Sequence, residues 1–464
     1  MENSGLQYLP NPTDPQLERS PNQELLPLTA RVNSQNRLEI GGCDVAQLVD
    51  QFGSPLYILD ETTVRTACRQ YRDALKKYYP GESLVLYASK AWNCLALCAL
   101  VASEGLGIDV VSGGELYTAL EAGVSPDRLY LHGNYKSRSE LQLAIENGCT
   151  VVADNWLDLN NLVELSSERS PKAPIPVMVR FTPGIECHTH EYIRTGHLDS
   201  KFGFDPNQLD EVFSFLAGQP SLSGNGIHAH IGSQIFELQP HQDLAAVLAE
   251  TVGKASQYGL NITEVNVGGG LGIRYTEADD PPSIEAWVSA IAKSLADACR
   301  GKNLPLPKLL CEPGRSIVGP ACVTAYTVGP RKEIPDLRTY ISVDGGMSDN
   351  PRPITYQSVY RVVVANRMAD PLAETVTVAG KHCESGDIVV KDARLPANCR
   401  VGDILVVMGT GAYNYSMASN YNRLPRPSAV LVGDGESHII LERETYSDLI
   451  RQDRLPNQLR PDSP

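Results

Sequence analysis

Short apolar runs alternate with amphipathic segments from residue 84 to about residue 320. The runs are rich in β-branched residues and span 84–90, 108–112, 128–133, 150–154, 176–181, 226–232, 263–269 and 309–315. Between two of these runs, Leu244, Leu248 and Val252 recur at helical spacing, and Gly259 supplies a stop. Eight strands alternating with helices over roughly 230 residues predict a (β/α)8 barrel of the TIM type rather than an open sheet.

The pattern changes near residue 320. Beyond it, short strands such as TVTVAG and DILVVMG are separated by Pro and Gly, and few helical patterns remain. This predicts a second, mainly β-stranded domain built from residues 31–54 together with 321–464, beside a barrel of residues 55–320. A strand at 56–60 is expected to lead into the barrel through the helix at 61–79.

Composition narrows the class of protein. The formal net charge of −15 over 464 residues argues against nucleic acid or an anionic membrane as partner. The eleven cysteines form no CxxC pair, so the sequence indicates a reducing cytoplasm rather than a disulfide framework or a zinc ribbon. Residues 1–30 lack the features of a signal peptide and are expected to form a flexible tail. Polar residues interrupt the apolar stretch at 84–111, which excludes a transmembrane helix there.

Polar and glycine residues gather at the ends of the predicted strands, where barrels of this type carry their chemistry. Lys90 ends the first strand, Asp109 lies in the second and His230 ends the sixth. The loops after the last two strands contain Gly268, Gly269, Gly270, Glu312, Gly314 and Arg315.

These residue types match the needs of pyridoxal phosphate. Lys90 offers a Schiff-base amine, the glycine loop with Ser233 offers donors for a phosphate, and Glu312 offers a carboxylate for the pyridine nitrogen. His230 is placed to lie against the ring. Taken singly, each has an ordinary alternative: a lysine at a sheet edge, a bare glycine turn or a core histidine. A protonated ring nitrogen favours decarboxylation, because the ring then accepts the electron pair left on the α-carbon.

A series of motifs in fixed order carries a family resemblance. The motifs are YASKA, DVVSGGEL, HGN, HEYIRTGHLDSKFGF, HIGSQ, NVGGGLGI, EPGR, DNPRPITY, CESGD and GAYNYSMASNYN, between about residues 50 and 430. In this the chain resembles the pyridoxal-phosphate-dependent decarboxylases of the alanine-racemase-like fold, and most closely the diaminopimelate decarboxylase family. The resemblance implies decarboxylation of meso-2,6-diaminopimelate to L-lysine and carbon dioxide, the last step of lysine biosynthesis.

The resemblance also implies a role for individual residues. Lys90 would bond the cofactor, His230 would stack on its ring and Glu312 would meet its nitrogen. The glycine loop, Gly314 and Tyr413 would hold the phosphate region. The residues that would contact the substrate are Arg315, Arg352, Tyr356, Glu384 and Tyr413. Cys383 and Glu384 would come from the second subunit of a homodimer, with Cys383 as proton donor.

The substrate assignment has a physical basis of its own. Diaminopimelate carries an ammonium and a carboxylate at both ends, so a selective site must bind a distal zwitterion. Arg352 would grip the distal carboxylate and Glu384 the distal ammonium. A decarboxylase for ornithine, arginine or carboxynorspermidine, a racemase, and a non-catalytic relative that only binds the cofactor remain alternatives. An Arg in DNPRP and a Cys beside Glu in CESGD also have purely structural interpretations.

Two further features bear on this assignment. The HGNYK segment has Tyr135 where members of the family commonly carry Asn, which would affect packing of the loop near the cofactor. His188, His190 and Glu191 offer the ligand types of a metal site, but no second cluster completes one, so no metal is expected.

Overall fold

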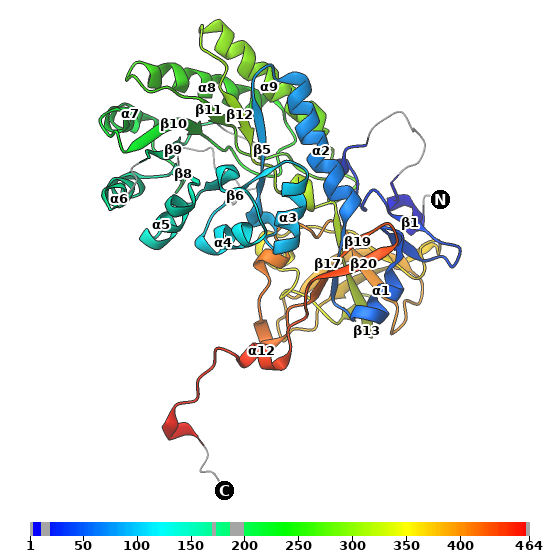
Figure 1. Cartoon of the computed structure of the whole chain (residues 1–464). Helices are drawn as coiled ribbons and strands as arrows, with labels where there is room; N and C mark the ends of the chain where they lie inside the picture. The colour runs from blue at the N-terminus through cyan, green and yellow to red at the C-terminus, as the bar shows by residue number, and fades with distance from the viewer. Residues whose placement is uncertain (1–2, 11–18, 169–172, 186–198, 461–464) are drawn as a thin grey trace.

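The structure is a computed structural model that describes residues 3–10, 19–168, 173–185 and 199–460. It contains two units, a barrel ringed by helices and a mainly β-stranded unit next to it (Figure 1). The last part of the chain extends away from both units (Figure 1).

Eight parallel strands close the barrel, in the order β10-β11-β12-β5-β6-β7-β8-β9. The strands are β5 (Ser83–Ala88), β6 (Gly107–Val110), β7 (Leu129–Leu131), β8 (Thr150–Ala153), β9 (Ile175–Arg180), β10 (Leu222–His228), β11 (Glu264–Asn266) and β12 (Lys308–Cys311). They coincide with the eight apolar runs, so the predicted (β/α)8 barrel is confirmed. The runs are nearly continuous because both faces of a barrel strand are covered.

Side chains fill the inside of the barrel, and helices cover its outside. Leu86, Tyr130, Val152, Met178 and Leu310 form a separate small core within it. The helices are α2 (Glu61–Tyr78), α3 (Leu95–Ser103), α4 (Gly113–Glu121), α5 (Arg138–Asn147), α6 (Trp156–Ser167), α7 (Leu209–Ala217), α8 (Gln239–Ser256), α9 (Ile284–Gly301) and α10 (Arg315–Val318). α4, α6 and α10 begin within four residues of the ends of β6, β8 and β12, so their first turns lie at the barrel mouth, the end at which the strands finish.

The second unit is built on a nine-stranded sheet with a small three-stranded sheet beside it. The larger sheet contains β4 (Leu56–Asp60), β13 (Cys322–Ile334), β14 (Arg338–Val343), β15 (Val362–Val364), β16 (Leu372–Ala379), β17 (Ile388–Pro396), β18 (Ile404–Val407), β19 (Ser428–Gly433) and β20 (Glu436–Leu441). The smaller sheet contains β1 (Arg31–Val32), β2 (Leu38–Ile40) and β3 (Cys43–Asp44). The remaining helices are α1 (Val45–Phe52), α11 (Arg352–Tyr356) and α12 (Tyr446–Ile450).

The strand at 56–60 belongs to the second unit, not to the barrel. It pairs with β13 in antiparallel and with β19 in parallel orientation. The helix that follows, α2, packs against α9 on the barrel. All five residues of β4 are buried, as in an inner strand of any sheet, so the apolar pattern alone could not tell which sheet it joins.

The described parts of the expected tail are packed against both units. Ser4 forms a bridge with Pro371 in the β unit, and Leu26 is fully buried. The Asn22 amide donates to the carbonyls of Gly272 (3.1 Å) and Pro282 (2.8 Å) on the barrel. The expectation of a flexible tail is therefore wrong for residues 3–10 and 19–30. The composition of this N-terminal segment, rich in Pro and Asn, is also found in segments that pack against a protein without forming a helix or a sheet.

Two expectations from composition concern the whole chain. Among the described helices, none is long and apolar enough to cross a membrane. Each of the ten cysteines that the structure describes is a free thiol; nine are buried and Cys383 is exposed.

Candidate active site

A cavity of about 330 Å³ opens at the barrel mouth. It brings together ten of the residues predicted from strand ends and motifs: Lys90, Asp109, His230, Ser233, Gly269, Gly270, Glu312, Gly314, Arg315 and Tyr413. They come from segments up to 323 positions apart in sequence, from Lys90 to Tyr413. A size of this order suits a small-molecule ligand.

Lys90 lies in a single helical turn directly after β5. The turn, η3 (Ser89–Ala91), is tied to α4 because the Ser89 hydroxyl donates to the Glu115 carboxylate at 2.9 Å. Lys90 itself is exposed and lines the cavity. The ammonium group that ends this apolar strand therefore belongs to the cavity wall.

Glu312, which follows β12, is a carboxylate surrounded by polar side chains. Its Oε2 accepts from His228 Nε2 at 3.0 Å, and its Oε1 accepts from the Asn266 amide at 2.6 Å and lies 2.8 Å from His132 Nε2. Burial alone would raise the pKa of Glu312, but His132 and His228 outweigh burial and hold it well below its usual range. The carboxylate is thus ionised at neutral pH, as a partner of a protonated pyridine nitrogen must be.

Three of these neighbours were missed by the sequence analysis. His132, His228 and Asn266 end or directly follow β7, β10 and β11. His132, His228 and Glu312 also offer metal-ligand atoms within 4.8 Å of one another. However, both imidazole Nε2 atoms already face the Glu312 carboxylate, and burial lowers the pKa of His228 to about 4, so its neutral ring donates a hydrogen bond there.

His230 packs against the glycine loop. Its Nδ1 accepts a hydrogen bond from the Gly269 backbone at 3.2 Å. Burial, then the nearby charges of Lys90 and Arg180, hold the pKa of His230 well below its usual range, so the ring is neutral at pH 7. A neutral ring fixed along one edge presents a flat surface to the cavity.

The glycines of the loop are needed for close packing. A Cβ on Gly269 would lie 2.3 Å from the Glu312 carbonyl oxygen, and one on Gly268 would lie 2.6 Å from His230 Nδ1. Gly268 has a φ of +66° and does not line the cavity itself. On the facing loop, a Cβ on Gly314 would lie 3.0 Å from the Ala88 carbonyl. The glycines therefore let backbone, rather than side chains, form this wall.

Arg315 also lines the cavity. Its Nε and Nη2 donate to the Ser233 hydroxyl at 3.1 and 3.0 Å, and its Nη1 donates to the Tyr275 hydroxyl at 2.7 Å. Its guanidinium lies 4.8 Å from the centre of the Tyr413 ring. Ser233, Tyr275 and Tyr413 thus hold a cation at the cavity wall.

Arg352 neighbours Tyr413, which lines the cavity, but does not line the cavity itself. Its guanidinium is 5.6 Å from the Tyr413 ring and 5.1 Å from that of Tyr356. The residue is only 7% exposed, and its Nη2 donates to Ser358 at 3.3 Å. Its Nε has no hydrogen-bond partner among the described residues.

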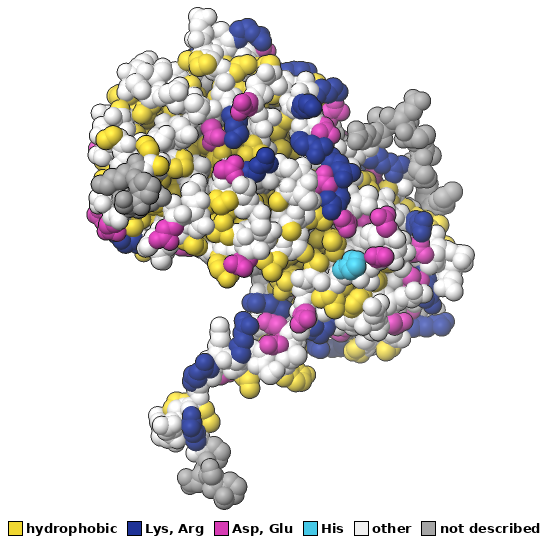
Figure 2. Space-filling view, viewed as in Figure 1, with side chains coloured by type: hydrophobic (Ala, Val, Ile, Leu, Met, Phe, Trp, Pro, Cys, Tyr) yellow, Lys and Arg dark blue, Asp and Glu magenta, His cyan; other side chains and the backbone are white. Residues whose placement is uncertain are grey.

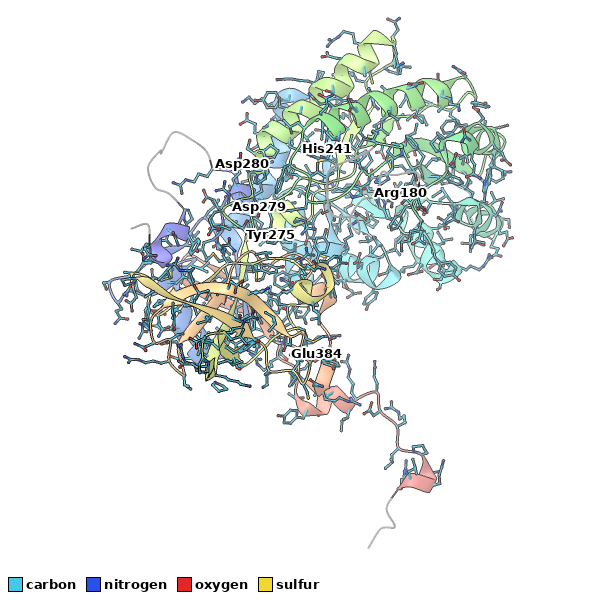
Figure 3. All side chains as sticks on the ribbon, turned by 180° about the vertical axis from the view of Figure 1, so that it is seen from behind. Arg180, His241, Tyr275, Asp279, Asp280 and Glu384 are labelled. Atoms are coloured by element: carbon cyan, nitrogen blue, oxygen red, sulfur yellow. The ribbon has the colours of Figure 1, made fainter. Side chains whose placement is uncertain are left out.

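Cys383 and Glu384 lie away from this chain's own cavity. They belong to the Cys383 loop (residues 381–386) between β16 and β17, and both side chains are exposed. In Figure 3, Glu384 lies at the edge of the β unit, well apart from Arg180, which lines the cavity in the barrel. One chain therefore does not bring all the predicted residues together.

The HGNYK segment lines the rim of the cavity. Tyr135 is mostly exposed, so it does not pack into the loop as its substitution for Asn led us to expect. The next residue, Lys136, is buried and donates to the Gly133 carbonyl at 2.6 Å and to Asp158 at 2.8 Å. This pair fixes the loop. The proposed metal ligands His188, His190 and Glu191 lie outside the described residues.

Comparisons with known proteins agree with this geometry. Residues 61–319 match the family model described as pyridoxal-dependent decarboxylase, pyridoxal binding domain. Diaminopimelate decarboxylase of Synechocystis is 63% identical, covering 98% of this chain and 97% of the relative, and that of Bacillus subtilis is 43% identical, covering 92% and 97%. The crystal structure of diaminopimelate decarboxylase from M. jannaschii in complex with L-lysine has a TM-score of 0.87 at 32% identity, covering 95% of this chain and 100% of that one. The chain belongs to the diaminopimelate decarboxylase family, within the pyridoxal-dependent decarboxylases.

Proposed function

We propose that the protein removes one carboxyl group of meso-2,6-diaminopimelate to give L-lysine and carbon dioxide, the last step of lysine biosynthesis, with pyridoxal phosphate bound at the barrel mouth. Arg352 is the observation that carries the choice of substrate. A buried guanidinium with an unpartnered N–H is costly unless a ligand accepts from it. A carboxylate at the far end of the substrate meets that need, and ornithine has no such group.

The residues of the cavity fit pyridoxal phosphate. Asp109 Oδ1 is buried without a hydrogen-bond partner in the described part of the chain, and the close-packed backbone at Gly269 and Gly314, where a Cβ has no room, lines the cavity. When bound, the cofactor accepts the electron pair left on the α-carbon as the carboxyl group departs. The Lys90 amine, which lines the cavity, would hold the cofactor through its aldehyde group.

Two residues act on the ring. The ionised Glu312 carboxylate, supported by His132, His228 and Asn266, keeps a proton on the ring nitrogen. His230, which is neutral and held by the Gly269 N–H, would pack against the ring. Asp109 and Ser233, with Gly268, Gly269, Gly270, Gly314 and Tyr413, complete the cofactor site, and Arg315 binds the substrate carboxylate beside it.

The remaining groups come from a second copy of the chain. Cys383 carries a thiol, a group suited to return a proton to the α-carbon. Glu384 accepts the distal ammonium of the substrate, and Tyr356 lies against Arg352. The Cys383 loop is exposed and lies apart from the cavity of its own chain. A homodimer in which each loop completes the partner's cavity accounts for the exposure of the loop and for its distance from the cavity of its own chain.

The direct test measures lysine and carbon dioxide from meso-diaminopimelate with purified protein and pyridoxal phosphate. We expect turnover by the unaltered protein, none by Lys90→Ala, and a rise in KM of about 100-fold for Arg352→Ala, the range expected when a site loses the partner of a buried charge. Ornithine is the control substrate. Turnover of ornithine in preference to diaminopimelate would contradict the role given to Arg352.

Mixing two inactive variants tests the shared site. A dimer of one Lys90→Ala chain and one Cys383→Ala chain contains one site with both residues intact. Random exchange makes half of all dimers mixed, so about a quarter of the activity should return. If no activity returns while native mass measurements show that subunits have exchanged, Lys90 and Cys383 act within the same chain.

A reducing compartment, the cytoplasm, follows from the thiol chemistry. Cys383 is exposed, and oxidation would remove the proton it is proposed to donate. Mild oxidation should abolish activity and dithiothreitol should restore it. A protein fully active after stoichiometric oxidation of Cys383 would not need such a compartment.

A further inference from the structure

The chain beyond β20 ends in a segment that lies outside both units. We call residues 446–460 the C-terminal arm; it begins with α12 and then continues without helix except for one short turn. Figure 1 shows it extending away from the rest of the molecule. Its apolar side chains are Tyr446, Ile450, Leu455 and Leu459, which are 81%, 59%, 54% and 64% exposed.

Exposed apolar side chains at this density mark a contact surface. Figure 2 shows yellow side chains along the arm that face solvent. Holding such a segment in place costs conformational entropy, and apolar contacts usually offset that cost. In a single chain, all four of these apolar side chains remain exposed to solvent.

The root of the arm is nevertheless firmly attached. Thr445 caps α12 through a reciprocal hydrogen-bond pair with Asp448. The Arg423 guanidinium donates to the Leu449 carbonyl at 2.5 Å and pairs with Asp453 at 2.8 Å. The direction in which the arm leaves the body is therefore fixed by Arg423.

The same turn also holds the Cys383 loop. Arg423 belongs to η8 (Tyr421–Arg423). The Asn422 side chain accepts a hydrogen bond from the Cys383 backbone at 2.9 Å, and the Tyr421 ring stacks on His382 with 5.9 Å between ring centres. One three-residue turn thus connects the arm to the residue proposed to act in another copy's site.

We infer that the C-terminal arm packs on a second copy of this chain, beside that copy's barrel mouth, and so holds Cys383 over its cavity. The inference rests on the shared-site dimer proposed above. The partner on which the arm packs is a second copy of the chain, because the Cys383 loop next to the arm would complete the cavity of that copy. The surface that receives the arm is apolar and surrounds the mouth: Leu95, Tyr117, Tyr135 and Leu157 are exposed on α3, α4, the loop after β7 and α6.

A full-length double variant tests the arm. In Leu455→Asp/Leu459→Asp, two apolar contacts become charged, and the two-fold symmetry of a dimer applies each change twice. Leu306→Asp is the control: it is 40% exposed and precedes β12, at the end of the barrel opposite the mouth. Sedimentation of the enzyme reconstituted with pyridoxal phosphate, over a range of concentrations, gives the dimer dissociation constant.

We expect the double variant to raise this constant about 100-fold and the control to leave it unchanged. Specific activity should fall on dilution, return at high concentration, and be accompanied by faster labelling of Cys383 with a thiol reagent. If the double variant does not fold, deletion of residues 456–464 keeps the Arg423 contacts and gives the same test.

An unchanged dissociation constant in a folded variant would overturn the inference, as would an unaltered protein that is monomeric at all concentrations. If the unaltered protein dimerises through the arm but releases no lysine, the arm is supported and the proposed reaction is contradicted. The two proposals therefore fail in different measurements.

Discussion

The barrel mouth and the Cys383 loop differ in how many contacts a single chain provides to their functional side chains. At the mouth, three polar side chains lie within 3.0 Å of Glu312, which is almost fully buried. In the loop, the backbone of Cys383 is held by Asn422, while the side chains of Cys383 and Glu384 face solvent. The groups proposed to bind the cofactor are thus preorganised in each chain, whereas the groups proposed to complete the reaction are presented outward.

Two buried carboxylates show the same difference in electrostatic terms. Histidines hold the pKa of Glu312 low, whereas burial raises the pKa of Asp349 to about 7. Asp349 lies just before Arg352 and accepts from the Tyr326 hydroxyl and from the Gly346 backbone. The barrel mouth therefore stabilises the negative charge of Glu312, whereas the surroundings of Asp349 in the β unit favour its neutral carboxyl group.

Lys90→Ala should cause the largest change at the mouth. We expect turnover to fall on the order of 10⁴-fold or more, because the amine proposed to hold the cofactor is lost. The absorption of bound cofactor and the rate of lysine release should disappear together, with far-ultraviolet circular dichroism unchanged. Appreciable turnover without added amines would show that another group bonds the cofactor.

Glu312→Gln separates charge from shape at the mouth. The amide keeps the size of the side chain but lacks the negative charge that is proposed to keep the ring nitrogen protonated, so kcat should fall about 10²–10³-fold. Glu277→Gln, which removes a carboxylate paired with Arg361 on the surface, is the matched control and should retain activity. Equal activity of the two variants would remove Glu312 from the mechanism.

Cys383→Ser tests the role of the exposed Cys383 loop. We expect kcat to fall about 10²-fold, the lower end of the effect of a proton donor, with a melting temperature within about 1 °C of the unaltered protein because the side chain is exposed. Ser385→Ala, two positions away in the same loop, should leave both quantities unchanged. A large loss of stability in Cys383→Ser would indicate a structural role instead.

Asp349→Asn should change the pH dependence of stability. An unfolded Asp titrates near 3.9, while Asp349 in the folded chain titrates near 7, so between these values the folded state binds the extra proton. The free energy of unfolding should therefore fall as pH rises from about 4 to about 7, by at most about 1.4 kcal/mol per unit. Asparagine cannot ionise, so denaturant titrations of the variant should lack this slope; an identical slope would assign it to other groups.

The sequence was sufficient for the barrel and for its principal polar residues. Eight apolar runs became eight strands, and residues placed by their strand ends, such as Lys90 and Glu312, meet in one cavity. His132, His228 and Asn266 were missed because each is a single polar residue at or just after the end of a strand, and only closure of the barrel brings them close to Glu312. Arg352 was found through its motif, but its unpartnered Nε depends on neighbours that are distant in sequence.

The placement of β4 and of the N-terminal segment was harder to predict from the sequence. The five buried residues of β4 are compatible with either sheet, because periodicity reports burial and not the identity of the neighbouring strands. The N-terminal segment failed for the opposite reason: its packing depends on single hydrogen bonds such as those of Asn22, which leave no periodic pattern.

The placement of β4 between β13 and β19 has a consequence for the order in which the molecule is made. β4 leaves the ribosome near the start of synthesis, whereas β19 (Ser428–Gly433) follows only after the whole barrel. β13 (Cys322–Ile334) also follows the barrel, so at about 5–20 residues per second both edges of β4 wait on the order of tens of seconds for their partners. Nascent chains are therefore most exposed to aggregation through β4, and the final tens of residues, rather than the barrel, close the fold.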